Sequence, residues 1–302
     1  MDKELNRIIE VARNVSRPYR VRKGKTFKLK DYSPGDLGDF DKADKQRFQE
    51  GLKSGVEALS RLQEMLYAQS RWGLLAVFQA MDAAGKDGSI KHVMSGVNPQ
   101  GCNVHSFKAP SSEELRHDFL WRCSKLLPER GMISIFNRSY YEEVLAVRVH
   151  PEYLQKQQLP PQLVSKDVWE ERYEAIRNME SHLARNGFVV RKIFLHLSKG
   201  EQKRRFLGRL EEADRHWKFS IADTTERQYW DQYQHAYEKA IRATATPDAP
   251  WYVVPADNKW YARIVVAGAL IDALSELDLA FPEVDAAKRK QLAAARRALQ
   301  AG

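Results

Sequence analysis

The sequence predicts an α/β fold in which helices cover both sides of a central parallel sheet of five strands. Short, continuous apolar runs alternate with segments of helical periodicity, which is typical of buried strands joined by helices. Two of these runs end directly in polar or glycine-rich segments, and open parallel sheets bind ligands at the carboxyl ends of their strands. The five predicted strands cover residues 74–78, 103–107, 132–136, 188–197 and 251–254.

Helices are expected wherever apolar residues recur every three or four positions. Residues 111–114, Ser-Ser-Glu-Glu, have the hydroxyl caps and acidic first turn of a helix start, and Pro128 ends the helix that they begin. The predicted helices cover residues 5–15, 45–68, 111–127, 166–185 and 258–276.

Composition and charge favour one large domain with two appended segments. Of the 302 residues 43% are apolar, which is enough for a substantial core, and the net charge is +9. Residues 1–30 hold ten Lys/Arg against three Asp/Glu. We expect a basic N-terminal extension over 1–43, either wrapped on the body or loosely tied to it, a main domain over 44–284 and a helical tail over 285–302. Such a charge suits a polyanion, which could be nucleic acid, a phosphate-rich small molecule or a phosphate polymer, although a solvated surface has the same composition.

Three features favour a cytoplasmic protein with no membrane partner. The cysteines, Cys102 and Cys123, have no disulfide or metal-ligand spacing, as expected in a reducing compartment. The longest apolar run, 264–271, is far shorter than the about 20 residues that span a bilayer. No signal-peptide core follows Met1.

The segment 82–89 joins the first strand to a helical pattern and predicts a phosphate-binding loop. Unpaired amides at a helix N-terminus carry partial positive charge, two glycines let the backbone approach a ligand, and a lysine adds a full charge. The alternative is an ordinary strand-to-helix turn with a solvated lysine. The predicted phosphate-binding residues are Ala83, Ala84, Gly85, Lys86, Asp87, Gly88 and Ser89.

This loop departs from the nucleotide-binding pattern G-x-x-x-x-G-K-[ST] at two positions. Ala80 stands where the pattern has its first glycine, and Asp87 where it has a hydroxyl, so the nearest hydroxyl is that of Ser89. Asp82, at the rim of the loop, would repel an anion unless a divalent cation lay between them. Asp82 therefore predicts a Mg²⁺ site.

A second polar cluster, residues 137–143, follows the strand 132–136. Arg138 suits the bidentate recognition of phosphate oxygens. Glu142 could hold a second metal ion or orient a substrate. The alternative is that Arg138 and Glu142 form a structural ion pair at the end of the strand.

Residues 199–243 predict a pair of basic helices that closes over phosphate as a lid. Arg205 and Arg209 lie four residues apart, on one helical face. Lys218, in the break before the second helix, is a further predicted phosphate ligand. The alternative is a solvated helix with ordinary surface charge. The apolar side chains expected to face the body are Phe206, Leu207 and Leu210.

Four segments of the chain resemble the polyphosphate kinase 2 family in their order and spacing. They are FQAMDAAGKDGSIKHVMSGVNPQG, ISIFNRSYYEEVLAVRVHPEYL, EQKRRFLGRLEEADRHWKFS and APWYVVPADNKW, and the resemblance covers roughly residues 45–276. Members of that family resemble thymidylate kinase in fold and transfer phosphate between inorganic polyphosphate and nucleotides with Mg²⁺. The resemblance implies a three-layer P-loop kinase fold with a helical lid.

The second of these segments refines the resemblance. Family members restricted to a single phosphorylation step tend to read F-D-R-S-x-Y-N, whereas residues 136–142 read F-N-R-S-Y-Y-E, so the acid has moved from position 137 to 142. This looks like the third class of the family, whose members accept nucleoside monophosphates and diphosphates such as AMP and ADP or GMP and GDP. The expected assembly is a homo-oligomer, a dimer or a tetramer, with no nucleic acid partner.

The resemblance implies a role in phosphoryl transfer for each candidate residue. The loop amides and Lys86 grip polyphosphate near the scissile bond, and Asp82 anchors Mg²⁺. Arg138 bridges the donor and acceptor phosphates, while Arg205 and Arg209 close over them from the lid.

Two rival functions stay open. An ATP-dependent nucleoside monophosphate kinase would need a similar loop and lid, although the missing glycine and hydroxyl argue against ATP held in the usual way. A non-catalytic nucleic-acid-binding protein could use the basic N-terminal segment. That segment has no basic-aromatic repeat, and the chain shows no helix-turn-helix or zinc-finger signature.

Overall fold

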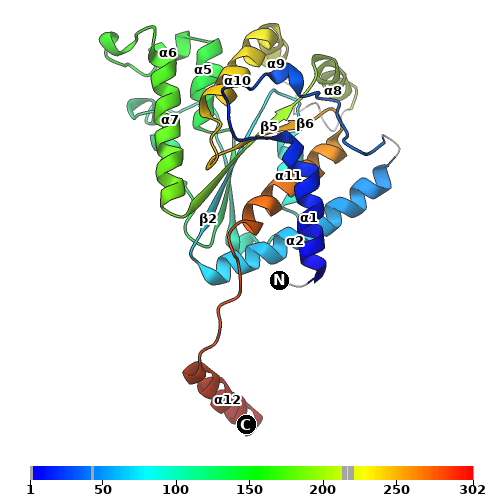
Figure 1. Cartoon of the computed structure of the whole chain (residues 1–302). Coiled ribbons are helices and arrows are strands. Elements are labelled where there is room, and N and C mark those ends of the chain that lie inside the picture. The colour runs from blue at the N-terminus through cyan, green and yellow to red at the C-terminus, as the bar shows by residue number, and fades with distance from the viewer. Residues whose placement is uncertain (1–2, 42–43, 213–215, 217–220, 302) are drawn as a thin grey trace.

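The computed structural model describes residues 3–41, 44–212, 216 and 221–301, and Figure 1 shows how their helices and strands are arranged. In this part of the chain six strands form one sheet, in the order β1-β6-β5-β2-β4-β3. The five predicted strands are confirmed. They run parallel and are β2 (Gly73–Ala80), β3 (Cys102–Ser106), β4 (Ile133–Asn137), β5 (Phe188–His196) and β6 (Trp251–Pro255).

The sixth strand, β1 (Arg20–Val21), pairs antiparallel with β6 at the edge of the sheet. The prediction of five strands missed it, because a strand of two residues contains no periodicity that could be detected in the sequence. β1 belongs to the basic N-terminal segment, so part of this segment completes the sheet.

Helices cover both faces of the sheet, as predicted (Figure 1). The α-helices of six or more residues are α1 (Lys3–Ser16), α2 (Lys45–Gln69), α3 (Lys86–Val93), α7 (Val168–Arg185), α8 (Lys199–Glu211), α9 (Ile221–Glu226), α10 (Trp230–Thr244), α11 (Lys259–Ser275) and α12 (Ala286–Ala301). The short helices are α4 (Trp121–Ser124), α5 (Ala146–Val149), α6 (Glu152–Gln155) and the 3₁₀ turns η1 (Arg17–Tyr19), η2 (Leu29–Asp31), η3 (Pro99–Gly101), η4 (Glu114–Arg116), η5 (Tyr140–Val144), η6 (Pro161–Leu163) and η8 (Arg227–Tyr229).

The core consists of two apolar layers, one on each face of the sheet. The first lies against α1, α2, α3 and α11, and the second against α7 and α10. On β2, Leu74, Ala76 and Phe78 belong to the first layer, and Leu75 and Val77 to the second. A strand buried on both faces needs apolar residues at every position, which explains the continuous run in the sequence.

The long helix predicted over 111–127 does not form. Ser111 and Glu114 make the reciprocal hydrogen bonds of a capping box, but only the single turn η4 follows. The Asp118 carboxylate accepts a hydrogen bond from the Leu120 amide at 3.0 Å, and the short helix α4 begins after this turn. Such a bond between an aspartate and the nearby backbone competes with a continuous helix.

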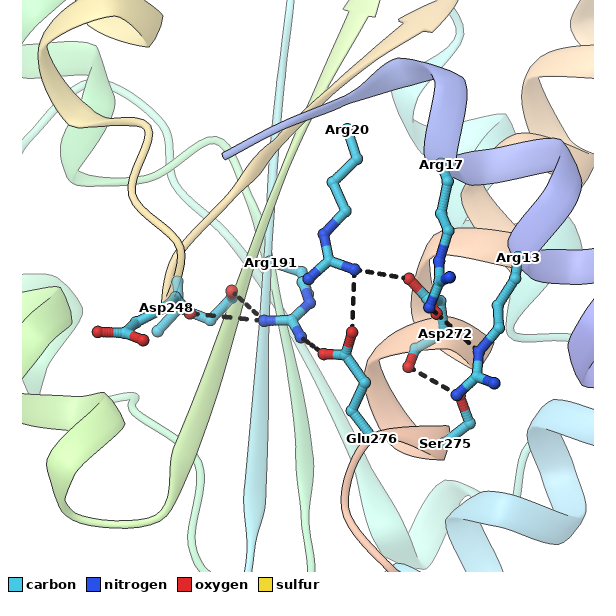
Figure 2. Close-up of polar contacts among 9 residues, drawn as sticks. Arg13, Arg17, Arg20, Arg191, Asp248, Asp272, Ser275 and Glu276 are labelled. Atoms are coloured by element: carbon cyan, nitrogen blue, oxygen red, sulfur yellow. Dashed lines mark hydrogen bonds and ion pairs between the residues drawn. The ribbon is translucent and has the colours of Figure 1, made fainter. Parts of the chain in front are cut away.

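An arginine cluster attaches α1 and β1 to α11 (Figure 2). Arg13, Arg17 and Arg20 bond the carboxylate of Asp272 at 3.1, 3.2 and 2.9 Å, and this carboxylate is fully buried. Arg20 also bonds Glu276 at 2.9 Å. Three of the ten cations of residues 1–30 therefore hold the fold together.

Of the two alternatives for the N-terminal extension, the structure shows the wrapped one over residues 3–41. The contact between α1 and α11 is close enough to explain a glycine inside α11. A Cβ atom at Gly268 would lie 2.7 Å from the carbonyl oxygen of Ala12, which is closer than real Cβ atoms come. Backbone approach of this kind requires glycine.

The C-terminal helix α12 stands apart from the body in Figure 1, and none of its residues is buried. The predicted helical tail is therefore an exposed helix. Within the described ranges, every helix is too short or too polar to cross a bilayer.

Removing the central carboxylate of the arginine cluster should destabilise the protein. We expect Asp272→Asn to lower the free energy of unfolding by about 2 kcal/mol, less than for a fully buried pair because Arg13 and Arg17 are partly exposed. Chemical denaturation measures this change. The exposed Glu283→Gln is the control. If Asp272→Asn were as stable as that control, the carboxylate would not hold the N-terminal segment.

Candidate functional site

The loop between β2 and α3 has the backbone geometry of an anion-binding site. Gly85, at φ +94°, caps α3, and the Ser89 amide donates to the Gly85 carbonyl at 2.9 Å. The amides of residues 86–88 come before this first helical bond, so they are available to a ligand. Ala83 also has a positive φ, +65°, which strains a residue with a side chain. The loop therefore needs support from another element.

Arg205 of α8 supplies this support. Its guanidinium group donates to the carbonyl oxygens of Ala83 and Ala84 at 3.0 and 2.9 Å, and to those of residues 256 and 257, after β6, at 2.6 and 3.0 Å. Its Nε donates to Glu201 at 2.7 Å. These bonds use all five N–H groups of the side chain. In this structure Arg205 therefore supports the loop, and its predicted role as a lid residue that bonds phosphate oxygens stays a prediction.

Arg138 and Asp82 lie together at the ends of neighbouring strands. Nη2 of Arg138 is 3.1 Å from Oδ1 of Asp82, and both side chains are partly exposed. The backbone of Arg138 has φ +63°, and its amide donates to the Phe78 carbonyl of β2 at 3.0 Å. The charge of Glu142 is the main cause that raises the pKa of Arg138, and Asp82 acts in the same direction. Arg138 is therefore a partly exposed cation between two carboxylates.

Gln79, which the sequence analysis did not single out, holds Glu142 in place. Gln79 is fully buried near the end of β2. Its Nε2 donates to Oε1 of Glu142 at 2.7 Å, and its Oε1 accepts from the Ser139 hydroxyl at 3.1 Å. The sequence did contain a signal, because a glutamine that interrupts a buried apolar strand needs polar partners.

Lys86 adjoins these charges at the start of α3. Burial is the main cause that lowers the pKa of Lys86, and Arg138 acts in the same direction. The nearby carboxylates of Glu142, Asp82 and Asp87 oppose this change in the pKa. Two cations held side by side in a partly dehydrated position suit a ligand with a high density of negative charge.

The carboxylate of Asp87 accepts a hydrogen bond from a residue of the neighbouring strand β4. Asn137, at the end of β4, donates from Nδ2 to Oδ1 of Asp87 at 2.8 Å. The same amide group also donates to the Ser106 hydroxyl, at the end of β3, at 3.3 Å. The side chain of Asp87 therefore joins the loop to β3 and β4, and its predicted contact with phosphate through the backbone amide stays a prediction.

Two adjoining cavities are both lined by Arg138 and Glu142. The smaller cavity, of about 60 Å³, is lined by Asp82, Arg138 and Glu142 together with side chains of the lid. The larger cavity, of about 340 Å³, shares Arg138 and Glu142 and extends along residues 107–122. The structure thus brings the loop, Arg138 and the lid to one place. The lid residues at the smaller cavity are Gln202, Glu226, Arg227, Tyr233 and Tyr237.

Polar side chains connect the lid to the loop. Gln202 of α8 donates to the Asp82 carbonyl at 3.0 Å and accepts from Arg227 at 2.7 Å. The lid therefore rests on the first residue of the phosphate loop. The predicted phosphate ligand Lys218 lies outside the described residues.

Helix α8 presents a different face to the body from the predicted one. Phe206 is buried as expected, but Leu207 and Leu210 are 47% and 48% exposed. Arg205 is buried instead, because its guanidinium group reaches the loop carbonyls. The guanidinium carbon of Arg209 lies 5.4 Å from the centre of the Phe206 ring.

Asp82 and Glu142 are the two predicted metal ligands, and both line the smaller cavity. Among the described residues, no three His, Cys, Asp or Glu side chains are grouped to hold a metal ion. Mg²⁺ commonly takes one or two carboxylates and completes its coordination with water and substrate phosphates. The pair therefore fits a metal ion bound together with a phosphorylated substrate.

Comparisons with known proteins agree with this geometry. The family model for polyphosphate kinase 2 matches residues 42–282. An "ADP-polyphosphate phosphotransferase" of Rhodopseudomonas palustris is 52% identical over 277 residues, which cover 89% of this chain and 96% of that protein. An "AMP/ADP-polyphosphate phosphotransferase" of Meiothermus ruber is 43% identical over 272 residues, which cover 90% of this chain and 97% of that protein.

A solved structure is similar along most of its length. The crystal structure of polyphosphate kinase 2 from Arthrobacter aurescens TC1 matches with a TM-score of 0.82 and 40% sequence identity. The match covers 91% of this chain and 95% of that one. The fold is therefore shared with that protein almost from end to end.

Arg205→Lys should loosen the phosphate loop even in the absence of substrate. One ammonium group cannot bond four carbonyl oxygens in two separate segments, so we expect the amides of 82–89 to exchange with deuterium about tenfold faster. The control is Arg204→Lys, since Arg204 also pairs with Glu201 but is 72% exposed. Unchanged exchange in substrate-free Arg205→Lys would contradict the supporting role.

Proposed function

The chain belongs to the polyphosphate kinase 2 family, and we propose that it transfers phosphoryl groups between inorganic polyphosphate and nucleotides in a reaction that needs Mg²⁺. The observation that carries the proposal is the smaller cavity, where Asp82 of the loop, Arg138 and the lid meet. The two relatives support polyphosphate as one substrate, because the names of both include it.

Phosphoryl transfer depends on position and charge more than on covalent help from the protein. The amides of residues 86–88 and the ammonium group of Lys86 hold the phosphates beside the scissile bond. Arg138, which faces Asp82, neutralises charge on the transferring group. Asp82 and Glu142 would hold Mg²⁺, which would neutralise charge on the phosphate oxygens.

The larger cavity suits the nucleotide. Its volume of about 340 Å³ is within the range of small-molecule pockets, about 300 to 1,000 Å³. Tyr153, which is 37% exposed, offers an aromatic surface for a base, and Lys108 and Arg122 offer positive charge for phosphates. Since the cavity reaches Arg138 and Glu142, a nucleotide phosphate in it would arrive beside the transferring group.

Both nucleoside mono- and diphosphates are proposed acceptors, AMP and ADP or GMP and GDP. Glu142 is the acid that distinguishes the third class in the resemblance, and it lies on the wall shared by the two cavities. The two relatives differ in this respect, because one is named for ADP and the other for AMP and ADP. The acceptor range of this chain therefore needs its own measurement.

The nucleic-acid alternative loses support from the structure of the N-terminal segment. Arg13, Arg17 and Arg20 bond the carboxylate of Asp272 in α11, so three of the ten cations that suggested a polyanion surface serve the fold. The predicted homo-oligomer and the predicted cytoplasmic location stay predictions.

Polyphosphate should serve as the phosphoryl donor with no ATP added. We expect long-chain polyphosphate and Mg²⁺ to convert ADP to ATP, and chelation of the metal to stop turnover. Lys86→Ala and Arg138→Ala should each lower kcat by about 10³-fold or more, because each removes a cation that neutralises the transferring group. Coupled detection of ATP measures both effects.

The matched control for these variants is Lys53→Ala, an exposed lysine of α2 outside both cavities. Phosphorylation of AMP only when ATP is supplied would favour the ATP-dependent kinase instead. Near wild-type turnover of either variant at saturating polyphosphate would remove that residue from the mechanism.

Glu142→Asn should change the choice of acceptor. We expect the ratio of kcat/KM for AMP to that for ADP to fall by about tenfold or more, because Glu142 shapes the wall where the shorter nucleotide must be placed. Parallel assays with AMP and ADP measure the ratio, and the exposed Glu152→Gln is the control. An unaltered ratio would show that Glu142 does not admit the monophosphate.

A further inference from the structure

Two buried tyrosines separate Arg138 from Glu142 in the chain. Tyr140 and Tyr141 begin the turn η5 and are 2% and 0% exposed. Both hydroxyl groups donate to the same oxygen, Oε1 of Glu180 on α7, at 3.0 and 2.9 Å. The turn η5, which carries Glu142 and begins two residues after Arg138, is therefore anchored on one carboxylate.

The other oxygen of this carboxylate faces a buried cation. Oε2 of Glu180 accepts from Nζ of Lys192, on β5, at 2.6 Å, and both side chains are almost completely buried. Nζ also donates to the carbonyl oxygen of Thr244 at 2.8 Å. Burial is the main cause that lowers the pKa of Lys192, and Glu180 opposes it. Neither Glu180 nor Lys192 lines either cavity, so the ion pair lies behind the walls of the site.

The same lysine connects the turn to the lid. Thr244 is the last residue of α10, the helix whose Tyr233 and Tyr237 line the smaller cavity. Trp251 of β6 also bonds Thr244, since its Nε1 donates to the Thr244 hydroxyl at 2.9 Å. One connected network therefore joins η5, α7, β5, β6 and the end of α10.

Stability alone is a weak reason for such a pair. A buried ion pair gives little net stability compared with well-packed apolar side chains, although removal of one partner is strongly destabilising. Two charges at this depth need another explanation, and the contacts with η5 suggest one. The positive φ of Arg138 shows that its backbone is strained and must be held by its surroundings.

We propose that Glu180 and Lys192 are positioning residues for phosphoryl transfer, which hold Arg138 and Glu142 in place through the hydroxyl groups of Tyr140 and Tyr141. The inference rests on the proposed function, since it concerns the geometry of the same site. A displacement of about 1 Å at such a group can cost about 10²-fold in rate. The loss should appear in kcat more than in KM, because a misplaced Arg138 still attracts substrate but stabilises the transition state less well.

The first test removes the two hydroxyl groups and keeps the rings. We expect the double variant Tyr140→Phe/Tyr141→Phe to lower kcat with polyphosphate by about tenfold or more, while KM for polyphosphate and ADP changes by less than about twofold. The control is Tyr173→Phe, because Tyr173 is equally buried but its hydroxyl contacts Arg148 and not Glu180. A double variant with wild-type kcat would overturn the proposal.

The second test separates positioning from stability. A quadruple variant that adds Glu180→Leu and Lys192→Met to the two Phe substitutions replaces the network with apolar side chains of similar size. We expect its melting temperature to equal or exceed that of the wild type, while kcat stays as low as in the double variant. Wild-type kcat in the quadruple variant, or a fall in kcat that follows a fall in melting temperature, would overturn the proposal.

Amide hydrogen exchange tests the same network without a catalytic assay. We expect the amides of residues 138–145 to exchange about tenfold faster in the double variant than in the wild type or Tyr173→Phe. A wild-type protein inactive with polyphosphate but with this exchange pattern would contradict the proposed function and leave the anchoring of the turn intact. Equal exchange in all three proteins would overturn the anchoring itself.

Discussion

The buried guanidinium group of Arg205 connects segments that follow the carboxyl ends of two strands, where the site lies. Arg205 bonds the loop after β2 and the chain after β6, and these strands are not neighbours, because β5 lies between them. The strained backbone of Ala83 depends on this bond. Since Arg205 belongs to α8, its hydrogen bonds join the phosphate loop to the first helix of the lid.

Charge in this basic chain is divided between the fold and the site. Arg13, Arg17 and Arg20 pair with the buried Asp272, and none of the four lines either of the two cavities at the site. Arg138, by contrast, keeps 42% of its side chain exposed at the smaller cavity. Burial and partners, and not the number of cations, decide which arginines can meet a phosphorylated ligand.

The strands β2, β4, β5 and β6 were predictable because each is mainly a local apolar run, and a parallel sheet needs such runs at its centre. The edge strand β3 has no buried residue and was predictable only from its short extended pattern after a turn. Two errors have different causes, one distant in the chain and one local. β1 has two residues and forms only because β6 offers an edge to pair with. The helix expected over 111–127 stops because Asp118 bonds the backbone two residues further on, a competition that periodicity does not reveal.

The sequence by itself determined the strand-loop-helix with the form of an anion-binding loop and pointed to Asp82, Lys86, Arg138 and Glu142, because motifs of this kind depend on residues close together in the chain. Only the tertiary structure decided what supports them. Gln79 meets Glu142 across 63 positions, and Arg205 meets Ala83 across 122. Partners that distant are chosen by packing of the whole chain, so no local pattern could show that an arginine of the lid holds the phosphate loop.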